Sequence, residues 1–135
     1  MALSFEEIKK IISNEETQMA FKEIKNKYGI ELSIFNLLTW GGQGLIFKTQ
    51  DIITKENIII KIPIYSPNKN KVIVEHTLLK EAQIYEYATK NHTTCVPALI
   101  AYSNEGKYLI HSYIEGENLR EYIKYHSNID LAIEL

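Results

Sequence analysis

The chain has 135 residues, of which 45% are hydrophobic and 24% charged, so a single globular domain is expected, and a fibrous repeat or wholesale disorder is excluded. The 15 Lys and Arg residues are nearly balanced by 17 Asp and Glu, and the resulting net charge of -2 gives no reason to expect a nucleic-acid or membrane partner. The single cysteine, Cys95, cannot form an internal disulfide, which favours a reducing, cytoplasmic compartment.

Residues 4–28 are predicted to be helical, with apolar side chains recurring on one face. A Ser followed three residues later by a Glu is the capping-box spacing of a helix start, and it occurs at Ser4–Glu7 and again at Ser13–Glu16. One bent helix or a short helical hairpin is therefore expected, with Gly29 as its C-terminal cap. We treat residues 1–29 as an N-terminal helical extension.

From Ile30 onward the spacing of apolar residues changes towards a period of two, and β-branched and aromatic residues become frequent, which predicts strands. The predicted strands are Glu31 to Trp40, Leu45 to Thr49, Asn57 to Tyr65, Ala98 to Tyr102 and Lys107 to Ile114. The third of these is the most apolar stretch of the chain, but Lys61 interrupts it and it is far too short to span a bilayer.

A helix is predicted between the third and fourth strands, over Val72 to Lys90, because its apolar residues form a stripe. Asn104–Gly106 has the composition of a hairpin turn, and two short helices are expected later, at Asn118 to about Tyr125 and at Asn128 to Leu135. The predicted fold class is α+β: a five-stranded antiparallel sheet with one main helix packed on it, plus the N-terminal helical extension.

Three features of this order carry chemical information. The turn Gly41–Gly44 is rich in glycine, Lys61 stands within an apolar strand, and Glu81 lies in the helix that follows. Taken singly, each has an ordinary structural explanation: a flexible hairpin, a lysine that strand alternation points to solvent, and an exposed acid. Taken together, in this order and at these separations, they resemble the small N-terminal lobe of a bacterial-type Ser/Thr protein kinase.

In protein kinases a glycine-rich strand-turn-strand covers the ATP phosphates, and the stretch Thr39 to Phe47 resembles it. Gly41 and Gly44 match the second and third glycines of that motif, and Thr39 stands where the first would be. Backbone without side chains can approach phosphate oxygens and point N–H groups at them. The resemblance implies this role for Gly41, Gly42, Gln43 and Gly44.

The stretch Ile58 to Lys61 is similar to the family's Val-Ala-Ile-Lys strand, whose lysine binds the α- and β-phosphates. Ile59 takes the position usually held by Ala, at the adenine site. Glu81 matches the helix glutamate that holds this lysine in an ion pair. A partly buried lysine needs such a partner, because an unpaired ammonium is costly to desolvate.

The stretch Tyr108 to Leu119 is similar to the fifth kinase strand and the hinge that follows it. By that alignment His111 is the gatekeeper, and the backbone carbonyl of Ser112 and the backbone groups of Ile114 would meet the adenine edge. The alternative for His111 is a core histidine with a satisfied hydrogen bond. The residues that the resemblance implies in nucleotide binding are Gly41, Gly42, Gln43, Gly44, Ile46, Ile59, Lys61, Glu81, His111, Ser112 and Ile114.

No metal site is expected, since the histidines lack metal-ligand spacing at His76, His92, His111 and His126. The kinase motifs that position the acceptor hydroxyl and hold magnesium, His-Arg-Asp and Asp-Phe-Gly, do not occur in the chain. The resemblance places the nucleotide-binding lobe at residues 30–118 and the start of a large lobe, truncated before the catalytic loop, at 119–135. We therefore expect weak ATP binding, Mg²⁺ only where a second lobe supplies ligands, and no phosphoryl transfer by the chain alone.

Two alternatives stay open. The chain could be a free-standing, pseudokinase-like binding or regulatory module, or the N-lobe of a small-molecule phosphotransferase of the aminoglycoside or choline type. The face that a large lobe would cover needs some partner, because an exposed apolar patch of that size favours association. The expected partners are a nucleotide and either a chain that carries a large lobe or a second copy, docked through the N-terminal helices or the exposed lower face.

Overall fold

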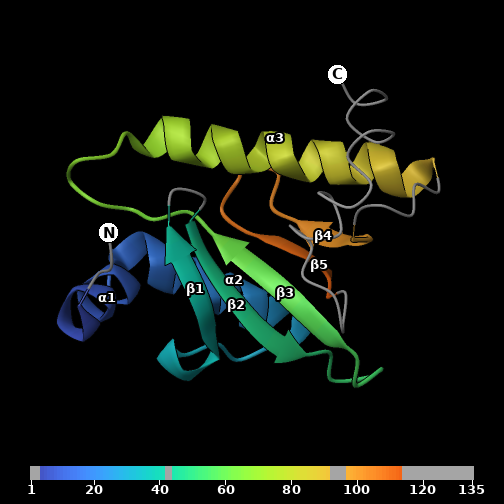
Figure 1. Cartoon of the computed structure of the whole chain (residues 1–135), viewed down its shortest axis with the longest axis horizontal. Helices are drawn as coiled ribbons and strands as arrows, with labels where there is room; N and C mark the ends of the chain where they lie inside the picture. The colour runs from blue at the N-terminus through green and yellow to red at the C-terminus, as the bar shows by residue number, and fades with distance from the viewer. Residues whose placement is uncertain (1–3, 42–43, 92–96, 114–135) are drawn as a thin grey trace, which may run out of the picture.

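The computed structural model of the chain (Figure 1) describes residues 4–41, 44–91 and 97–113. Its elements in chain order are α1 (Phe5–Ile12), α2 (Glu15–Tyr28), the 3-10 helix η1 (Ile34–Asn36), β1 (Leu37–Gly41), β2 (Gly44–Gln50), β3 (Asn57–Ile62), α3 (Lys71–Lys90), β4 (Leu99–Tyr102) and β5 (Leu109–Ser112). These elements confirm the predicted fold class, an α+β domain built on a five-stranded antiparallel sheet.

The sheet has the strand order β1-β2-β3-β5-β4, with every neighbouring pair antiparallel. The central strand, β3, pairs with β2 from Asn57 to Ile62 and with β5 from Ile58 to Lys61. Because β3 has neighbours on both sides, its backbone is fixed along almost its whole length. A side chain on β3 is therefore held in a well-defined position.

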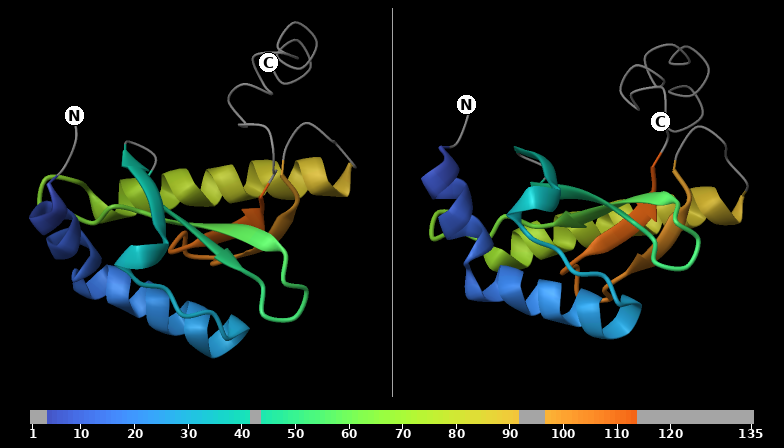
Figure 2. Two further views of the ribbon diagram at one scale, coloured as in Figure 1. Left: turned by 60° about the horizontal axis from the view of Figure 1, so that its bottom comes forward. Right: turned by 90° about the horizontal axis from the view of Figure 1, so that it is seen from below.

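The helices cover the two faces of the sheet: α1 and α2 lie on one side and α3 on the other (Figure 2). Strand alternation divides the β3 side chains between these sides. Ile58, Ile60 and Ile62 pack with the N-terminal helices, and this side is called the α2 face. Ile59 and Lys61 point to the opposite side, called the α3 face.

The α2 face carries the larger apolar core. Residues of the N-terminal helices, the strands and the segment after β3 all contribute to it: Ile8, Ile12, Ala20, Ile24, Leu45, Phe47, Ile58, Ile60, Ile62, Ile64, Tyr65, Tyr108 and Ile110 are among its buried members. The ring of Phe21 on α2 meets that of Phe47 on β2 edge to face, with centroids 5.4 Å apart. The N-terminal extension therefore shares one core with the sheet.

The α3 face has a smaller apolar cluster. Leu78, Ala82 and Tyr85 of α3 pack against Leu109 of β5, with Leu99 and Tyr102 of β4 at the margin. Of the helix residues on this face, Glu81 is polar and lies between Leu78 and Tyr85 along the stripe. This is the face on which the polar groups described below meet.

The two helix starts in the N-terminal region differ. The capping box at Ser4 and Glu7 is present as predicted, but the second start is wrong by one residue. Asn14 caps α2 by accepting a hydrogen bond from the Glu16 N–H, at 2.8 Å, whereas Ser13 ends α1. An Asn carbonyl serves as well as a Ser hydroxyl at this position, so the two residues compete for the cap.

The predicted first strand, Glu31 to Trp40, is also wrong in its first half, where Ile34–Asn36 forms η1 and the residues before it form no strand. The Ser33 side chain accepts from the Phe35 N–H, and the Asn36 side chain accepts from the Ser33 N–H. These local bonds give the backbone an alternative to the strand ladder. Strand β1 therefore starts only at Leu37.

The other strands are close to prediction: β2 extends one residue further at each end, whereas β3, β4 and β5 are shorter than predicted. Strand β3 ends at Ile62 and not at Tyr65, because Pro63 has no N–H to donate to the ladder. The hairpin turn before β5 is formed as predicted, with the Gly106 N–H donating to the Ser103 carbonyl at 3.0 Å. The helices expected at Asn118 to Tyr125 and Asn128 to Leu135, and the lone Cys95, lie outside the described residues.

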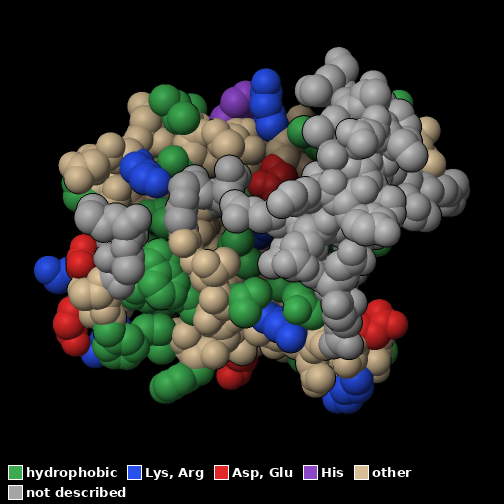
Figure 3. All heavy atoms as spheres, viewed as in Figure 1, with side chains coloured by type: hydrophobic (Ala, Val, Ile, Leu, Met, Phe, Trp, Pro, Cys, Tyr) green, Lys and Arg blue, Asp and Glu red, His purple; other side chains and the backbone are tan. Residues whose placement is uncertain are grey.

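Large apolar side chains are also found on the surface. Phe35 is 93% exposed and Ile53 88%, and Figure 3 shows apolar side chains gathered beside β1 and the neighbouring N-terminal helices. Across the described ranges, no helix is both long and apolar enough to cross a membrane.

Candidate functional site

Lys61 lies on the α3 face at the centre of the sheet. Its cross-strand partners are Ile46 on β2 and Leu109 on β5, so apolar neighbours flank it on both sides. Only 13% of its side chain is exposed. A lysine in this position keeps its charge only if an acidic partner and hydrogen bonds replace the water that it has lost.

Glu81 on α3 is that partner. The Lys61 Nζ donates to Oε2 of Glu81, which is twenty residues further along the chain and whose side chain is 20% exposed. The Lys61 Nζ also lies 5.6 Å from the centroid of the Tyr85 ring, within range of a cation–π contact. The predicted contact between Lys61 and Glu81 is thus present, and the alternative of two unrelated surface charges is not.

Tyr85 is a site residue that the sequence analysis did not single out. It follows Glu81 by one helical turn, so the two side chains share a face of α3. Burial raises the pKa of the Tyr85 hydroxyl, and the nearby Glu81 carboxylate raises it further. The available signal was this spacing of four, but apolar packing explains a tyrosine in such a stripe equally well.

Gly44 begins β2 immediately after the glycine-rich turn. Its φ is +114°, and a Cβ added there would lie 2.6 Å from the Ile62 carbonyl oxygen. Only glycine fits this conformation and this close approach. Gly41 ends β1 opposite it, whereas Gly42 and Gln43 lie outside the described residues.

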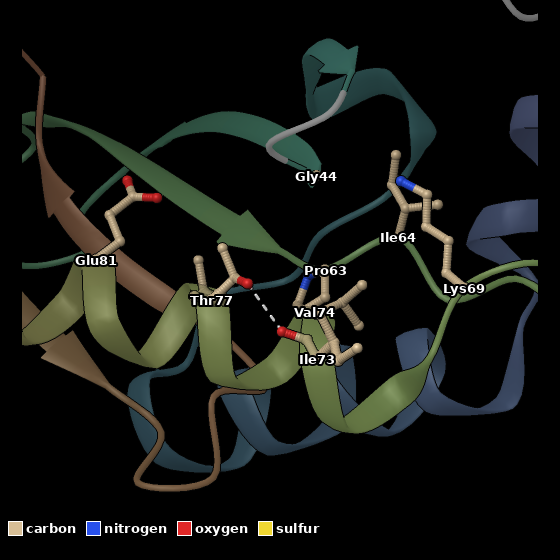
Figure 4. Close-up of a pocket in the computed structure, with 9 residues that line it drawn as sticks. Gly44, Pro63, Ile64, Lys69, Ile73, Val74, Thr77 and Glu81 are labelled. Carbon is tan, nitrogen blue, oxygen red and sulfur yellow. Dashed lines mark hydrogen bonds between the residues drawn. The ribbon is translucent and has the colours of Figure 1, made fainter.

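A cavity of about 210 Å³ separates the Gly44 turn from α3. Figure 4 shows it between Gly44, Glu81 and Lys69, with Pro63 and Val74 among the residues that line it. The Thr77 hydroxyl also lines it and donates to the Ile73 carbonyl within its own helix, at 2.9 Å. The cavity therefore lies between Gly44, the first residue of β2, and Glu81 of the ion pair.

His111 lies at the other end of the α3 face, and Ser112 follows it as the last residue of β5. His111 pairs across strands with Ile59, and its ring meets that of Tyr85 edge to face at 5.2 Å between centroids. The ring is only 4% exposed, and this burial lowers the pKa of His111 to about 4. The imidazole is therefore neutral at physiological pH.

The structure brings five of the eleven implied nucleotide-binding residues to one face. Side chains at Ile46, Ile59, Lys61 and His111 share the α3 face of three adjacent strands, and Glu81 reaches them from the helix. Ile59 is buried, at 6% exposure. Ile114 lies beyond the described part of the chain.

A charged network ties the start of α3 to the rest of the molecule. Glu16 on α2 binds Lys71 at 2.9 Å and Lys107 at 3.6 Å, and Lys107 also binds Glu75 at 3.3 Å. The Tyr65 hydroxyl donates to Glu75 at 2.8 Å. This network joins α2, α3 and the turn before β5.

Within the described ranges, no three His, Cys, Asp or Glu side chains are grouped so that they could hold a metal ion. No protein-family model matches the chain, and no curated protein matches it. The function is therefore inferred from the geometry of this face.

Proposed function

We propose that the chain is the ATP-binding small lobe of a protein kinase-like phosphotransferase. The observation that carries the proposal is the ion pair between Lys61 of β3 and Glu81 of α3, beside the cavity that begins at Gly44. An ammonium held in place by a carboxylate and largely removed from water is a fixed cation for phosphate oxygens. The sheet order and the packing of α3 on this face are compatible with such a lobe.

The two ends of the face suit the two ends of a nucleotide. Gly44 and Lys61 would bind the phosphates, because backbone N–H groups of a glycine-rich turn and a fixed positive charge both suit phosphate oxygens. Ile46 and Ile59 would contact the flat base through their apolar surfaces, and the Ser112 carbonyl is an acceptor at the margin of that surface.

The proposed role is binding and not catalysis by these 135 residues alone. The motifs that orient an acceptor hydroxyl and hold Mg²⁺ do not occur in the sequence. Phosphoryl transfer would therefore need a second lobe to supply them, and the small lobe would hold the nucleotide without requiring the metal.

Calorimetric titration of the 135-residue chain with ATP and with ADP, with and without Mg²⁺, tests this proposal. We expect weak binding that does not depend on Mg²⁺ and that Lys61→Met weakens about tenfold or more, because a hydrogen bond to a charged group is lost. Lys80→Met is the matched control, since Lys80 is an exposed lysine on α3. Equal affinity in the Lys61→Met variant and the wild type would overturn the proposal.

One observation favours the alternative of a regulatory module that binds no nucleotide. Ile59 places a larger side chain than Ala on the surface proposed for the base, and it is already buried. For such a module, neither ATP nor ADP would shift the thermal unfolding midpoint, and Lys61→Met would change stability without changing any ligand response.

A further inference from the structure

At Ser112, one of the two hydrogen bonds between β5 and the start of β4 uses a side chain in place of the backbone. The Ser112 N–H donates to the Ala98 carbonyl at 2.9 Å, as in any antiparallel pair. The return bond differs, because the Ala98 N–H donates to the Ser112 hydroxyl, at 2.9 Å, and not to its carbonyl. The side chain of Ser112 thus replaces its own carbonyl, which is released from the ladder.

His111 binds the released carbonyl. Its Nδ1 lies 2.7 Å from the Ser112 oxygen, and a carbonyl can only accept, so Nδ1 carries the proton. Since burial keeps the ring neutral, Nε2 is a bare acceptor. Nε2 is buried and has no hydrogen-bond partner in the described part of the chain.

This arrangement is an unusual use of a buried histidine. A neutral imidazole that occupied the core only for packing would satisfy both nitrogens or expose one to water. Here one nitrogen has no partner among the residues that the structure describes, while the other covers the Ser112 carbonyl. The ring is held by Tyr85 of α3 and lies across from Ile59 of β3.

We propose that His111 is an internal competitor for the Ser112 carbonyl: in the ligand-free chain it occupies the acceptor that the base of a bound nucleotide would use. This inference rests on the proposed nucleotide site. A base with an exocyclic amine, such as adenine, offers an N–H that replaces the imidazole N–H. A base with a carbonyl at that position, such as hypoxanthine, brings a second acceptor and gains nothing when His111 leaves.

His111 therefore lowers the affinity for adenine nucleotides without contacting the phosphates. Replacing it by a residue that has no N–H frees the carbonyl. His111→Phe keeps a ring against Tyr85, and His111→Leu is a smaller variant in case the phenyl ring obstructs the base. His76→Leu is the matched control, because His76 is exposed on α3.

The experiment titrates ATP and inosine triphosphate into the full chain and into each variant, after thermal unfolding has shown that each is folded. We expect the ATP affinity of His111→Phe or His111→Leu to rise about two- to tenfold, the value of one net hydrogen bond. The inosine triphosphate affinity should not rise, and His76→Leu should behave as the wild type. An ATP affinity that is unchanged or lower in both His111 variants would overturn the inference.

Nitrogen NMR of the imidazole gives a test that needs no nucleotide. We expect the His111 resonances to show a protonated Nδ1 and an unprotonated Nε2 at neutral pH. The opposite tautomer would overturn the inference whatever the titrations show. If ATP binding depends on Lys61 but neither His111 variant alters it, only this inference fails; if no variant binds ATP, the proposed function fails with it.

Discussion

The two faces of the sheet are built from the same strands but differ in the size of their apolar clusters and in the polar side chains that they bury. The α2 face is mainly apolar and packs residues of α1 and α2 against β2, β3 and β5, whereas the α3 face combines a small apolar cluster with Lys61, Glu81 and His111. Buried polar groups cost free energy unless they are paired. The contrast indicates that the α2 face supplies the stability that lets the α3 face hold these polar groups.

The largest effect is expected from Phe47 on the α2 face. Phe47 is fully buried and meets Phe21, so Phe47→Ala should lower the free energy of unfolding by about 3–5 kcal/mol. Urea denaturation measures this loss. Phe35→Ala is the control, because Phe35 is almost fully exposed. A similar loss in both variants would contradict the assignment of the main core to this face.

Gly106 allows a sharper comparison, because Gly29 shares its positive φ. A Cβ at Gly106 would lie 2.0 Å from the Glu75 carbonyl oxygen of α3, whereas one at Gly29 would meet only the tip of the Ile52 side chain, at 3.1 Å. Gly106→Ala should therefore cost about 2–4 kcal/mol, from backbone strain and overpacking together. Gly29→Ala should cost about 1 kcal/mol, from backbone strain alone. Equal losses of unfolding free energy in the two variants would show that α3 moves away from the added methyl group at little cost.

Glu81→Gln tests how strongly the α3 face depends on its ion pair. The change leaves the Lys61 ammonium largely buried without a charged partner, so we expect a loss of about 1–3 kcal/mol in the free energy of unfolding. Glu56→Gln, at an exposed carboxylate, is the control. If Glu81→Gln and Glu56→Gln unfolded at the same urea concentration, the ion pair would contribute nothing to the stability of the fold.

The smallest effect is expected at Glu16, where α2 meets α3. Its hydrogen bond with Lys71 lowers the pKa of the Glu16 carboxyl, so its contribution to stability is present at neutral pH and is lost as the pH falls below about 4. Glu16→Gln should be slightly less stable than the wild type at pH 7 and indistinguishable from it at pH 2. Glu15→Gln, one residue away and exposed, should show no such convergence.

The sheet and the ion pair could be predicted because their signals are strong and local. The β-branched run of β3, the glycine-rich turn and the hairpin at Gly106 each mark an element, and Lys61 and Glu81 are the only charges that match the motif at those two places. Strand β1 was less predictable. Its apolar residues satisfy a strand pattern, but the side chains of Ser33 and Asn36 bind the backbone and favour a turn of 3-10 helix.

Other features have no signal in the sequence. The run Ile58–Ile60 is apolar on both faces, so it does not reveal which side the N-terminal helices cover. The exchange at Ser112, where a hydroxyl takes the place of a carbonyl, depends on how β4 meets β5 across a turn. The contact of His111 with the next carbonyl depends on its rotamer, which packing against Tyr85 sets.

The close contact of Gly106 with Glu75 has a mechanical consequence for α3. It holds the helix near one end, and Glu81 lies six residues further along, about 9 Å from that fulcrum at 1.5 Å per residue. If α3 rotated by about 20° around Glu75, Glu81 would move by about 3 Å, because it lies about 9 Å from that pivot along the helix. Such a displacement separates the carboxylate from Lys61 while the fulcrum stays still.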